Sequence, residues 1–180
     1  MKLMFASDIH GSALWCEKML SVYEREKPEK LCLLGDILYH GPRNDLPEGH
    51  DPKEVIRLLN PLKNRLICVR GNCDTEVDQM VLDFPILAEY ALLYTDSHEM
   101  FITHGHHHDP HNLPPLPAGA VMINGHTHIP KAEFVNEIHC LNCGSAALPK
   151  ENTPHCCLVY ENDVFTWLNI CGETIMEYKL

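Results

Sequence analysis

Short apolar runs alternate with amphipathic stretches over the first 72 residues of the chain. Three of these runs predict buried strands, at 2–7, 31–34 and 66–69. After the first, Ser12 can cap a helix that runs to about Glu26, and Pro28 then stops it. Pro52 stands at the first-turn position of a second predicted helix, which extends to Leu59. Strands that alternate with helices are typical of parallel βαβ units, so the pattern predicts an α/β fold.

The second half of the chain has a different pattern. Runs at 100–103 and 121–124 predict two more strands, each followed by a turn that bears histidines. Shorter β-rich pieces follow, at 132–135, 138–141, 156–160 and 164–170, and residues 161–163 are the expected tip of a hairpin. No repeat, low-complexity tract or linker interrupts this order. We therefore expect a single domain with two sheets that spans residues 1–180.

Composition narrows the classes of function. A chain of 180 residues is long enough for one sizeable core. Its formal net charge of −11 opposes the phosphate backbone of nucleic acids, so general nucleic-acid binding is not expected. The apolar run before Asp8 is too short for a signal peptide, and no stretch approaches the ~20 apolar residues of a membrane span. These observations predict a cytoplasmic protein without a membrane partner.

The nine cysteines are spread from Cys16 to Cys171, and several stand in apolar runs. Reduced, buried thiols behave as small hydrophobic side chains, which is our interpretation for most of them. Cys140 and Cys143 form one CxxC pair without a second, so a structural zinc site there stays an alternative.

Polar residues gather where the predicted strands end. Asp8, Asp36 and Asn72 follow the first three strands, and functional groups of parallel sheets collect just beyond the carboxyl ends of strands. Together with the histidine turns they make five segments, which are DIH at 8–10, GD at 35–36, GNCD at 71–74, HGH at 104–106 and GHTH at 125–128. In DxH and HxH, alternate side chains of an extended segment point the same way, so both can face one centre.

Each segment alone has an ordinary structural explanation. A DxH pair is compatible with a turn aspartate beside a capped histidine, and the asparagine of GNxD with a turn residue that satisfies the backbone. The stretch HGHHHDPH is compatible with a solvated loop or an incidental metal binder. The order of the five segments, each at the end of a strand, favours one shared site.

The ordered set DxH, GD, GNxD, HGH and GHTH resembles the calcineurin-like metallophosphoesterase superfamily. Within it, the stretches MKLMFASDIHGS, GDILYHGPRN, VRGNCDTEVDQM and INGHTHIP are similar to the YfcE-type group of small bacterial phosphodiesterases. The resemblance runs from Met1 to about Leu148. It implies an α/β fold of the metallophosphoesterase type, a four-layer αββα sandwich of two mixed β-sheets flanked by helices.

The resemblance also implies a dinuclear metal centre. One ion would be held by Asp8, His10 and His128, the other by Asn72, His104 and His126, and Asp36 would bridge both. Oxygen and nitrogen ligands without a thiolate suit manganese, iron or zinc. The resemblance favours manganese, with zinc or iron as the alternatives.

The activity that the resemblance implies is hydrolysis of a phosphate ester by a hydroxide that the ions make available at neutral pH. Two divalent ions with the carboxylates of Asp8 and Asp36 would leave two positive charges. A hydroxide and a phosphodiester monoanion neutralise these charges, whereas a monoester dianion exceeds them. We therefore expect a phosphodiesterase for small substrates. The alternatives are a phosphomonoesterase at the same site and a non-catalytic scaffold of the retromer-subunit type, against which the complete ligand set argues.

Candidate catalytic residues are Asn72, Cys73 and Asp74. The asparagine can bind metal through its oxygen while its amide donates a hydrogen bond to hydroxide or phosphate. Many superfamily members have histidine where Cys73 stands, and a thiol with a usual pKa of about 8.5 is poorly matched to protonating a leaving group. We therefore expect a preference for acidic leaving groups.

Candidate substrate-binding residues lie in the loop after the second strand, and they are His40, Arg43 and Asn44. Arg43 can make a forked contact with phosphate, or it can stand as an exposed loop cation. Beyond a small phosphodiester substrate, the partner that the chain would support is a second copy of itself, at an exposed apolar edge.

Overall fold

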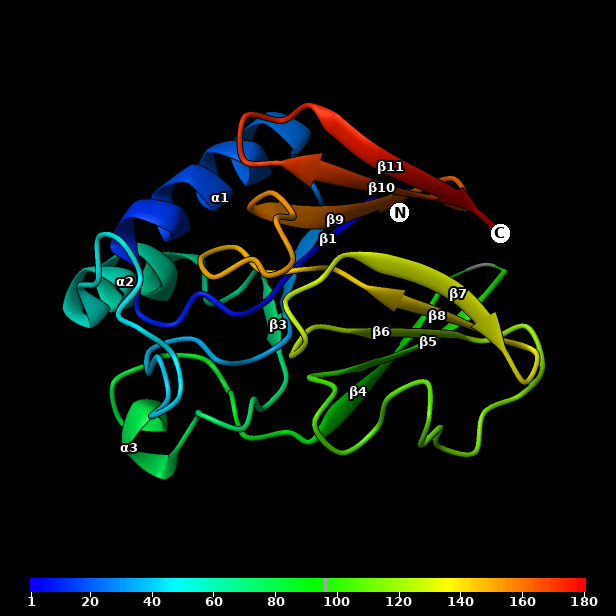
Figure 1. The fold of residues 1–180 in the computed structure, drawn as a ribbon, viewed down its shortest axis with the longest axis horizontal. Coiled ribbons are helices and arrows are strands. Elements are labelled where there is room, and N and C mark those ends of the chain that lie inside the picture. Colours follow the sequence, from blue (N-terminus) through cyan, green and yellow to red (C-terminus); the bar gives the residue numbers. More distant parts are fainter. Residues whose placement is uncertain (96) are drawn as a thin grey trace.

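Two mixed β-sheets form the body of the protein (Figure 1). The structure, a computed structural model, describes residues 1–95 and 97–180. One sheet has six strands in the order β11-β10-β9-β1-β2-β3, and the other has five in the order β4-β5-β6-β8-β7. The predicted pair of mixed sheets is therefore confirmed.

The six-stranded sheet joins the first three strands of the chain to the last three. Its parallel part comprises β1 (Leu3–Ala6), β2 (Lys30–Leu33) and β3 (Leu66–Cys68). Its antiparallel part comprises β9 (Cys156–Glu161), β10 (Val164–Asn169) and β11 (Thr174–Lys179). Because β9 pairs with β1, both ends of the chain lie in one sheet.

The five-stranded sheet is built from the middle of the chain. Its strands are β4 (Tyr90–Tyr94), β5 (Glu99–Thr103), β6 (Val121–Asn124), β7 (Lys131–Val135) and β8 (Ile138–Asn142). The three central strands β5, β6 and β8 are parallel, and β4 and β7 pair antiparallel at the two edges. Parallel strands end at the same edge of a sheet, so the histidine turns after β5 and β6 are neighbours.

The two longest helices cover the outer face of the six-stranded sheet (Figure 1). α1 (Ala13–Glu26) begins where Ser12 Oγ accepts a hydrogen bond from the Trp15 amide at 3.2 Å, which confirms the predicted cap. α2 (Pro52–Leu59) begins after Asp51, whose carboxylate accepts from the Glu54 amide at 3.1 Å. Two shorter helical segments follow, the 3₁₀-helix η1 (Asn60–Leu62) and α3 (Glu76–Gln79).

Apolar side chains pack in three layers. Alternate residues of β1 point to opposite faces, so Met4 packs toward α1 and α2 while Phe5 packs between the sheets. The fully buried Trp167 of β10 also lies between the sheets, where its indole Nε1–H donates to the Asn142 carbonyl at 2.7 Å. Two separate apolar clusters therefore pack against the six-stranded sheet, one on each face.

The outer face of the five-stranded sheet differs from the predicted four-layer arrangement. In the described residues it is covered by the irregular segment 105–120, with Leu113 and Leu116 packed on Phe101 and Met122, and not by helices. Four prolines fall in this segment, at 110, 114, 115 and 117. Proline lacks the amide hydrogen and clashes inside a helix, which explains why this layer is a loop.

The cysteines agree with their interpretation as small hydrophobic side chains. All nine are free, and eight of them are buried, Cys171 being the exposed one. The side chains of Cys140 and Cys143 pack on opposite faces of the five-stranded sheet, so the CxxC zinc alternative is wrong. Among the described residues, no helix combines the length and the apolar character that crossing a membrane requires.

Candidate metal centre

The seven predicted ligands come together where the two sheets meet. Asp8, Asp36 and Asn72 stand in the turns just after β1, β2 and β3 of the six-stranded sheet. His10 lies in the same turn as Asp8, and the other three imidazoles come from the turns after β5 and β6 of the other sheet, at positions 104, 126 and 128. Hydrogen bonds join the turns across the junction, because the His126 amide donates to Asp8 Oδ2 at 3.0 Å and Ser145 Oγ donates to the Asp8 carbonyl at 3.0 Å.

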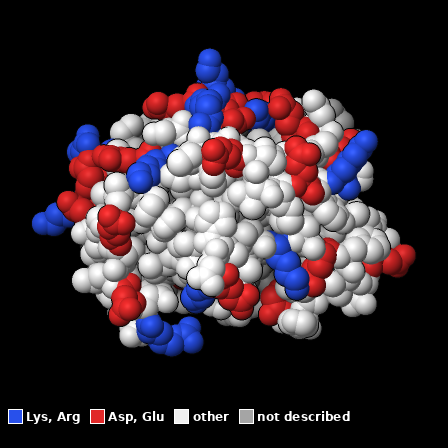
Figure 2. Space-filling view, turned by 45° about the horizontal axis from the view of Figure 1, so that its top comes forward, with Lys and Arg blue, Asp and Glu red and all other residues white. Residues whose placement is uncertain are grey.

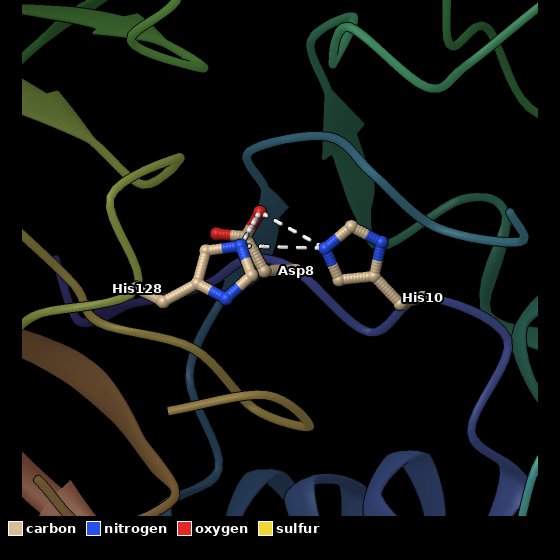
Figure 3. Close-up of side chains that lie close together, drawn as sticks. All are labelled: Asp8, His10 and His128. Carbon is tan, nitrogen blue, oxygen red and sulfur yellow. Dashed lines mark hydrogen bonds and ion pairs between the residues drawn. The ribbon is translucent and has the colours of Figure 1, made fainter. Parts of the chain in front are cut away.

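The first cluster consists of Asp8, His10 and His128, whose side chains converge in Figure 3. His10 Nε2 lies 3.6 Å from Asp8 Oδ1, and His128 Nε2 lies 3.3 Å from the same oxygen. The two Nε2 atoms are 3.4 Å apart. Two ligands bound at about 2.1 Å to one tetrahedral or octahedral ion would be roughly 3.0–3.4 Å apart, and two of these three separations lie in that range.

The outer ring nitrogens explain why a cation fits. His10 Nδ1–H can donate to the Tyr39 carbonyl at 2.8 Å, and His128 Nδ1–H to the Leu148 carbonyl at 2.5 Å. A neutral imidazole that donates through Nδ1 has a lone pair at Nε2, so the two Nε2 atoms face each other as acceptors. Two facing acceptors require a proton or a metal ion between them.

The second cluster is formed by Asp36, Asn72, His104 and His126. His104 Nε2 lies 3.0 Å from Asn72 Oδ1, 3.2 Å from His126 Nδ1 and 3.5 Å from Asp36 Oδ2. The His104 Nδ1–H faces the Leu34 carbonyl at 2.7 Å, which again leaves Nε2 as a lone-pair acceptor. Asp36 Oδ2 is also 3.7 Å from His10 Nε2 of the first cluster. One carboxylate oxygen thus faces both groups of ligands.

A buried oxygen without a hydrogen-bond partner also indicates a metal site. Asp8 is fully buried, and among the described residues its Oδ1 accepts no hydrogen bond. An unpaired charged oxygen away from water is costly, and metal coordination removes that cost. The donor set of carboxylate, amide and imidazole atoms therefore fits divalent ions of the manganese, iron or zinc type, and the residues present can hold two.

Backbone strain is concentrated on the ligands. Five of the seven have a left-handed backbone with φ between 49° and 67°, and they are Asp8, His10, Asp36, His126 and His128. Residues other than glycine rarely adopt this region, and such strain gathers at functional sites where the surroundings enforce it. A Cβ at Gly71 would collide with Asp36 Oδ1, so glycine is required there for the close approach of two turns.

Burial and neighbouring charges shift the pKa values of the predicted ligands in different directions. Burial opposes the charged form of Asp8, but its contacts with His10 and His128 outweigh this and hold its pKa well below the usual value. Burial also opposes a charged His10, whose pKa is nevertheless raised by the neighbouring Asp8. The pKa of His126 is lowered, by burial and by the adjacent His104.

Asp74, a predicted catalytic residue, holds backbone amides. Its Oδ2 accepts from the amides of Asp36 and Gly71, each at 2.8 Å, and its Oδ1 accepts from the Ile37 amide at 2.9 Å. It is almost completely buried, and burial raises its pKa despite these hydrogen bonds. The structure therefore places Asp74 behind the turn that carries Asp36.

A cavity of about 430 Å³ opens over the centre. Its lining includes the predicted residues Arg43, Asn44, Asn72 and Cys73 together with Asp36, His126 and His128. The lining of this cavity does not include the predicted His40, whose carbonyl accepts from Asn44 Nδ2 at 2.7 Å. The Cys73 thiol accepts from Asn72 Nδ2 at 3.2 Å, and burial with the nearby charge of Asp36 raises its pKa.

Sequence reasoning missed Lys150, which lines the same cavity. Its amide donates to the His128 carbonyl at 3.3 Å, and the preceding Leu148 carbonyl faces His128 Nδ1. Two hydrogen bonds therefore attach the turn that carries Lys150 to His128. Nothing in the local sequence indicates this, because the turn returns to the site from a different part of the chain.

These geometric features agree with the comparisons with known proteins. Residues 1–163 match the family described as the calcineurin-like phosphoesterase superfamily domain. The chain belongs to this family, and it is a phosphoesterase, a hydrolase of phosphoric esters. Its ligand clusters are the candidate metal sites of that enzyme class.

Individual relatives are more specific. The chain is 45% identical over 176 residues to the phosphodiesterase YfcE of Escherichia coli strain K12, covering 98% of this chain and 96% of the relative. A solved structure of this phosphoesterase from E. coli superposes with a TM-score of 0.96 at 44% identity, covering 99% of each chain. A Vps29 protein from Entamoeba histolytica gives a TM-score of 0.63 at 17% identity, covering 100% of this chain and 99% of that chain, which shows the fold alone.

Proposed function

We propose that the protein is a metal-dependent phosphodiesterase that hydrolyses small phosphodiesters at a dinuclear centre. The observation that carries the proposal is the position of Asp36 Oδ2, which faces one ligand cluster through His10 and the other through His104. The name of the E. coli relative, a phosphodiesterase, supports the choice of substrate class.

The proposed ligand sets follow the two clusters. One ion would be held by Asp8, His10 and His128, the other by Asn72, His104 and His126, and Asp36 would be shared. When bound, two divalent ions supply Lewis acidity and lower the pKa of water from 15.7 toward roughly 7. We propose manganese as the metal, which the resemblance to the YfcE-type group favours, while the oxygen and nitrogen ligands without a thiolate also suit zinc or iron.

The residues of the cavity receive the substrate. Arg43 and Lys150 line it without an ion-pair partner among the described residues, so both cations are available to a phosphate. The guanidinium suits a forked contact with two phosphate oxygens, and the ammonium acts as a point charge. We assign substrate binding to these two side chains, with Asn44 as the residue that shapes the loop of Arg43 through its hydrogen bond to the His40 carbonyl.

The size and the charge of the surface favour a small substrate. A cavity of about 430 Å³ suits a small ester. On the face drawn in Figure 2, Lys and Arg side chains are interspersed with Asp and Glu, and the middle of the face carries few charges. This face offers no continuous basic track for a polyanion, in keeping with the net charge of −11.

Cys73 limits the leaving groups that we expect. A thiol whose pKa is raised is a weaker proton donor than an ordinary one. Esters with acidic leaving groups need little protonation when the P–O bond breaks, so they should react fastest. Asn72 Nδ2, which donates to Cys73 in the free enzyme, can instead donate to a phosphate oxygen.

The wider setting is also a proposal. We infer a single domain, because residues from the beginning, middle and end of the chain share the apolar cluster between the sheets. We propose a cytoplasmic protein. An exposed apolar row on the edge strand β4, formed by Tyr90, Leu92 and Tyr94, would support a homo-oligomer.

A comparison of bis(4-nitrophenyl) phosphate with 4-nitrophenyl phosphate tests the function. The metal-stripped enzyme should be inactive, and manganese should restore diester hydrolysis more than monoester hydrolysis. Lys150→Gln and Arg43→Gln should each raise KM by about tenfold, the effect of losing roughly 1.4 kcal/mol of binding. Lys53→Gln, which removes an exposed lysine of α2, is the matched control. Faster hydrolysis of the monoester would favour the phosphomonoesterase alternative. A monoester dianion carries more negative charge than the centre neutralises, and Arg43 and Lys150 would then supply the missing positive charge.

A further inference from the structure

A second group of metal-binding side chains lies outside the dinuclear centre. Glu89, His106 and His107 each offer a ligand atom, and these atoms lie within 4.8 Å of one another. Strand register explains why they meet, because Tyr90 of β4 pairs with Thr103 at the end of antiparallel β5. Glu89 therefore stands just before one strand, where the histidine turn leaves the other.

The contacts within the group leave metal-binding atoms available. His107 Nδ1 faces Glu89 Oε2 at 2.9 Å, while Glu89 Oε1 lies 3.9 Å from Arg70 Nη1, so the two carboxylate oxygens have different neighbours. His106 Nδ1 is buried and, among the described residues, has no hydrogen-bond partner. A buried ring nitrogen without a partner is a cost that a bound cation would remove.

The surrounding structure holds this turn in place. Asn112 Nδ2 donates to the His107 carbonyl at 2.7 Å, and Thr103 Oγ1 donates to the Glu89 carbonyl at 3.3 Å. The ring centroids of His106 and His107 are 3.9 Å apart. The next histidine of the run, His108, turns away and packs edge-on against Phe101. The group is thus a defined set of three residues and not the whole histidine-rich stretch.

We infer that Glu89, His106 and His107 form a third divalent-cation site, distinct from the dinuclear centre. Two imidazoles and one carboxylate are a ligand set that suits zinc, with the remaining positions open to water. The exposed fractions of His107 and Glu89, 61% and 48%, indicate an exchangeable ion that binds more weakly than ions of the buried centre. The ring of His106 lies 5.3 Å from that of His104, so the site is adjacent to the second cluster.

Equilibrium dialysis of the metal-stripped protein against increasing Zn²⁺, with bound zinc counted by mass spectrometry, tests this site. Wild type should bind three equivalents, the third at least about tenfold more weakly, since its ligands are exposed. His107→Ala and Glu89→Gln should each bind two. Both variants should keep the manganese-supported esterase activity, because neither residue contacts the dinuclear centre.

His111→Ala is the matched control, because it removes an exposed histidine of the same loop that is outside the group. It should keep the third equivalent. Saturation of wild type at two equivalents, or a third equivalent that persists in both His107→Ala and Glu89→Gln, would overturn the inference. Failure of the phosphodiesterase proposal would be seen separately, as absent diester hydrolysis in a protein that still binds three ions.

Discussion

The two sheet edges that build the centre contribute different chemistry. The six-stranded edge supplies every proposed oxygen ligand, from Asp8, Asp36 and Asn72, together with one imidazole, that of His10. The five-stranded edge supplies imidazoles only, at positions 104, 126 and 128. One side of the site therefore carries the negative charge that balances the ions, and the other carries neutral donors. Neither sheet contains a complete ligand set.

The two edges also hold their ligands in different ways. On the six-stranded side, Asp74 collects three backbone amides and so fixes the turn of Asp36. On the five-stranded side, which has no such carboxylate support, His104 and His128 are each held through Nδ1 by a backbone carbonyl, as His10 is on the other side. The first arrangement depends on one side chain, whereas the second depends on the fold. Substitutions can distinguish these two forms of support.

The largest effect is expected from Asp36→Asn. The variant removes charge from the one oxygen that faces both clusters, and bound manganese should fall from two ions to one or none. Changes to residues that only orient metal ligands cost about 10–100-fold, so this loss of diester hydrolysis should exceed about 100-fold. His128→Gln removes a neutral ligand from a single cluster and should cost less.

Asp83→Asn is the control for charge, because Asp83 forms a surface ion pair with Lys63 at 3.3 Å. The activity of the Asp83→Asn variant should equal that of wild type. Two tightly bound ions in Asp36→Asn, with activity within tenfold of wild type, would remove the shared-ligand assignment and with it the comparison of the two edges.

A smaller effect is expected from Asp74→Asn, which weakens the support of one edge. An amide can accept only through its oxygen, so at least one of the three backbone amides loses its partner. The dissociation constant for manganese should rise by about 10–100-fold, while kcat at saturating manganese should recover most of its value. Asp78→Asn is the neighbouring control, since Asp78 caps α3 at Thr75. A kcat that stays low at saturating metal would instead support Asp74 as a catalytic residue.

The sequence predicts well which polar side chains meet, because they lie in short motifs at strand ends. The turns after β1, β2, β3, β5 and β6 bring together all seven predicted residues, although the sequence positions extend from Asp8 to His128. The helix starts at Ser12 and Pro52 were also predictable, since capping is decided by residues that are adjacent in sequence.

Features set by distant contacts were not predictable. The role of Asp74 depends on amides from two other turns, and Lys150 reaches the cavity through a turn attached to His128. The edge strands β4 and β11 were not predicted, because their side chains are exposed or only partly buried and so form no clear apolar run. Likewise, only packing showed that a proline-rich segment covers the five-stranded sheet.

The smallest effect concerns pH and separates one imidazole of each edge. In the metal-free protein, Asp8 raises the pKa of His10 above its usual value despite burial, whereas burial lowers that of His126. As the pH falls, His10 therefore gains its proton first, and manganese must displace it. Below the raised pKa, affinity at the first cluster should fall by up to about tenfold per pH unit, the effect of one competing proton. Proton competition at His126 should begin only below its lowered pKa.

Manganese titrations followed by electron paramagnetic resonance between pH 8 and 6 should thus resolve two classes of ion whose affinities fall with different slopes as the pH falls. His139→Gln is the control and should leave both slopes unchanged, because the His139 ring contacts Tyr178 Oη at 2.8 Å and is not part of the cavity lining. Equal slopes for the two ions in wild type would show that the edges do not differ in this respect.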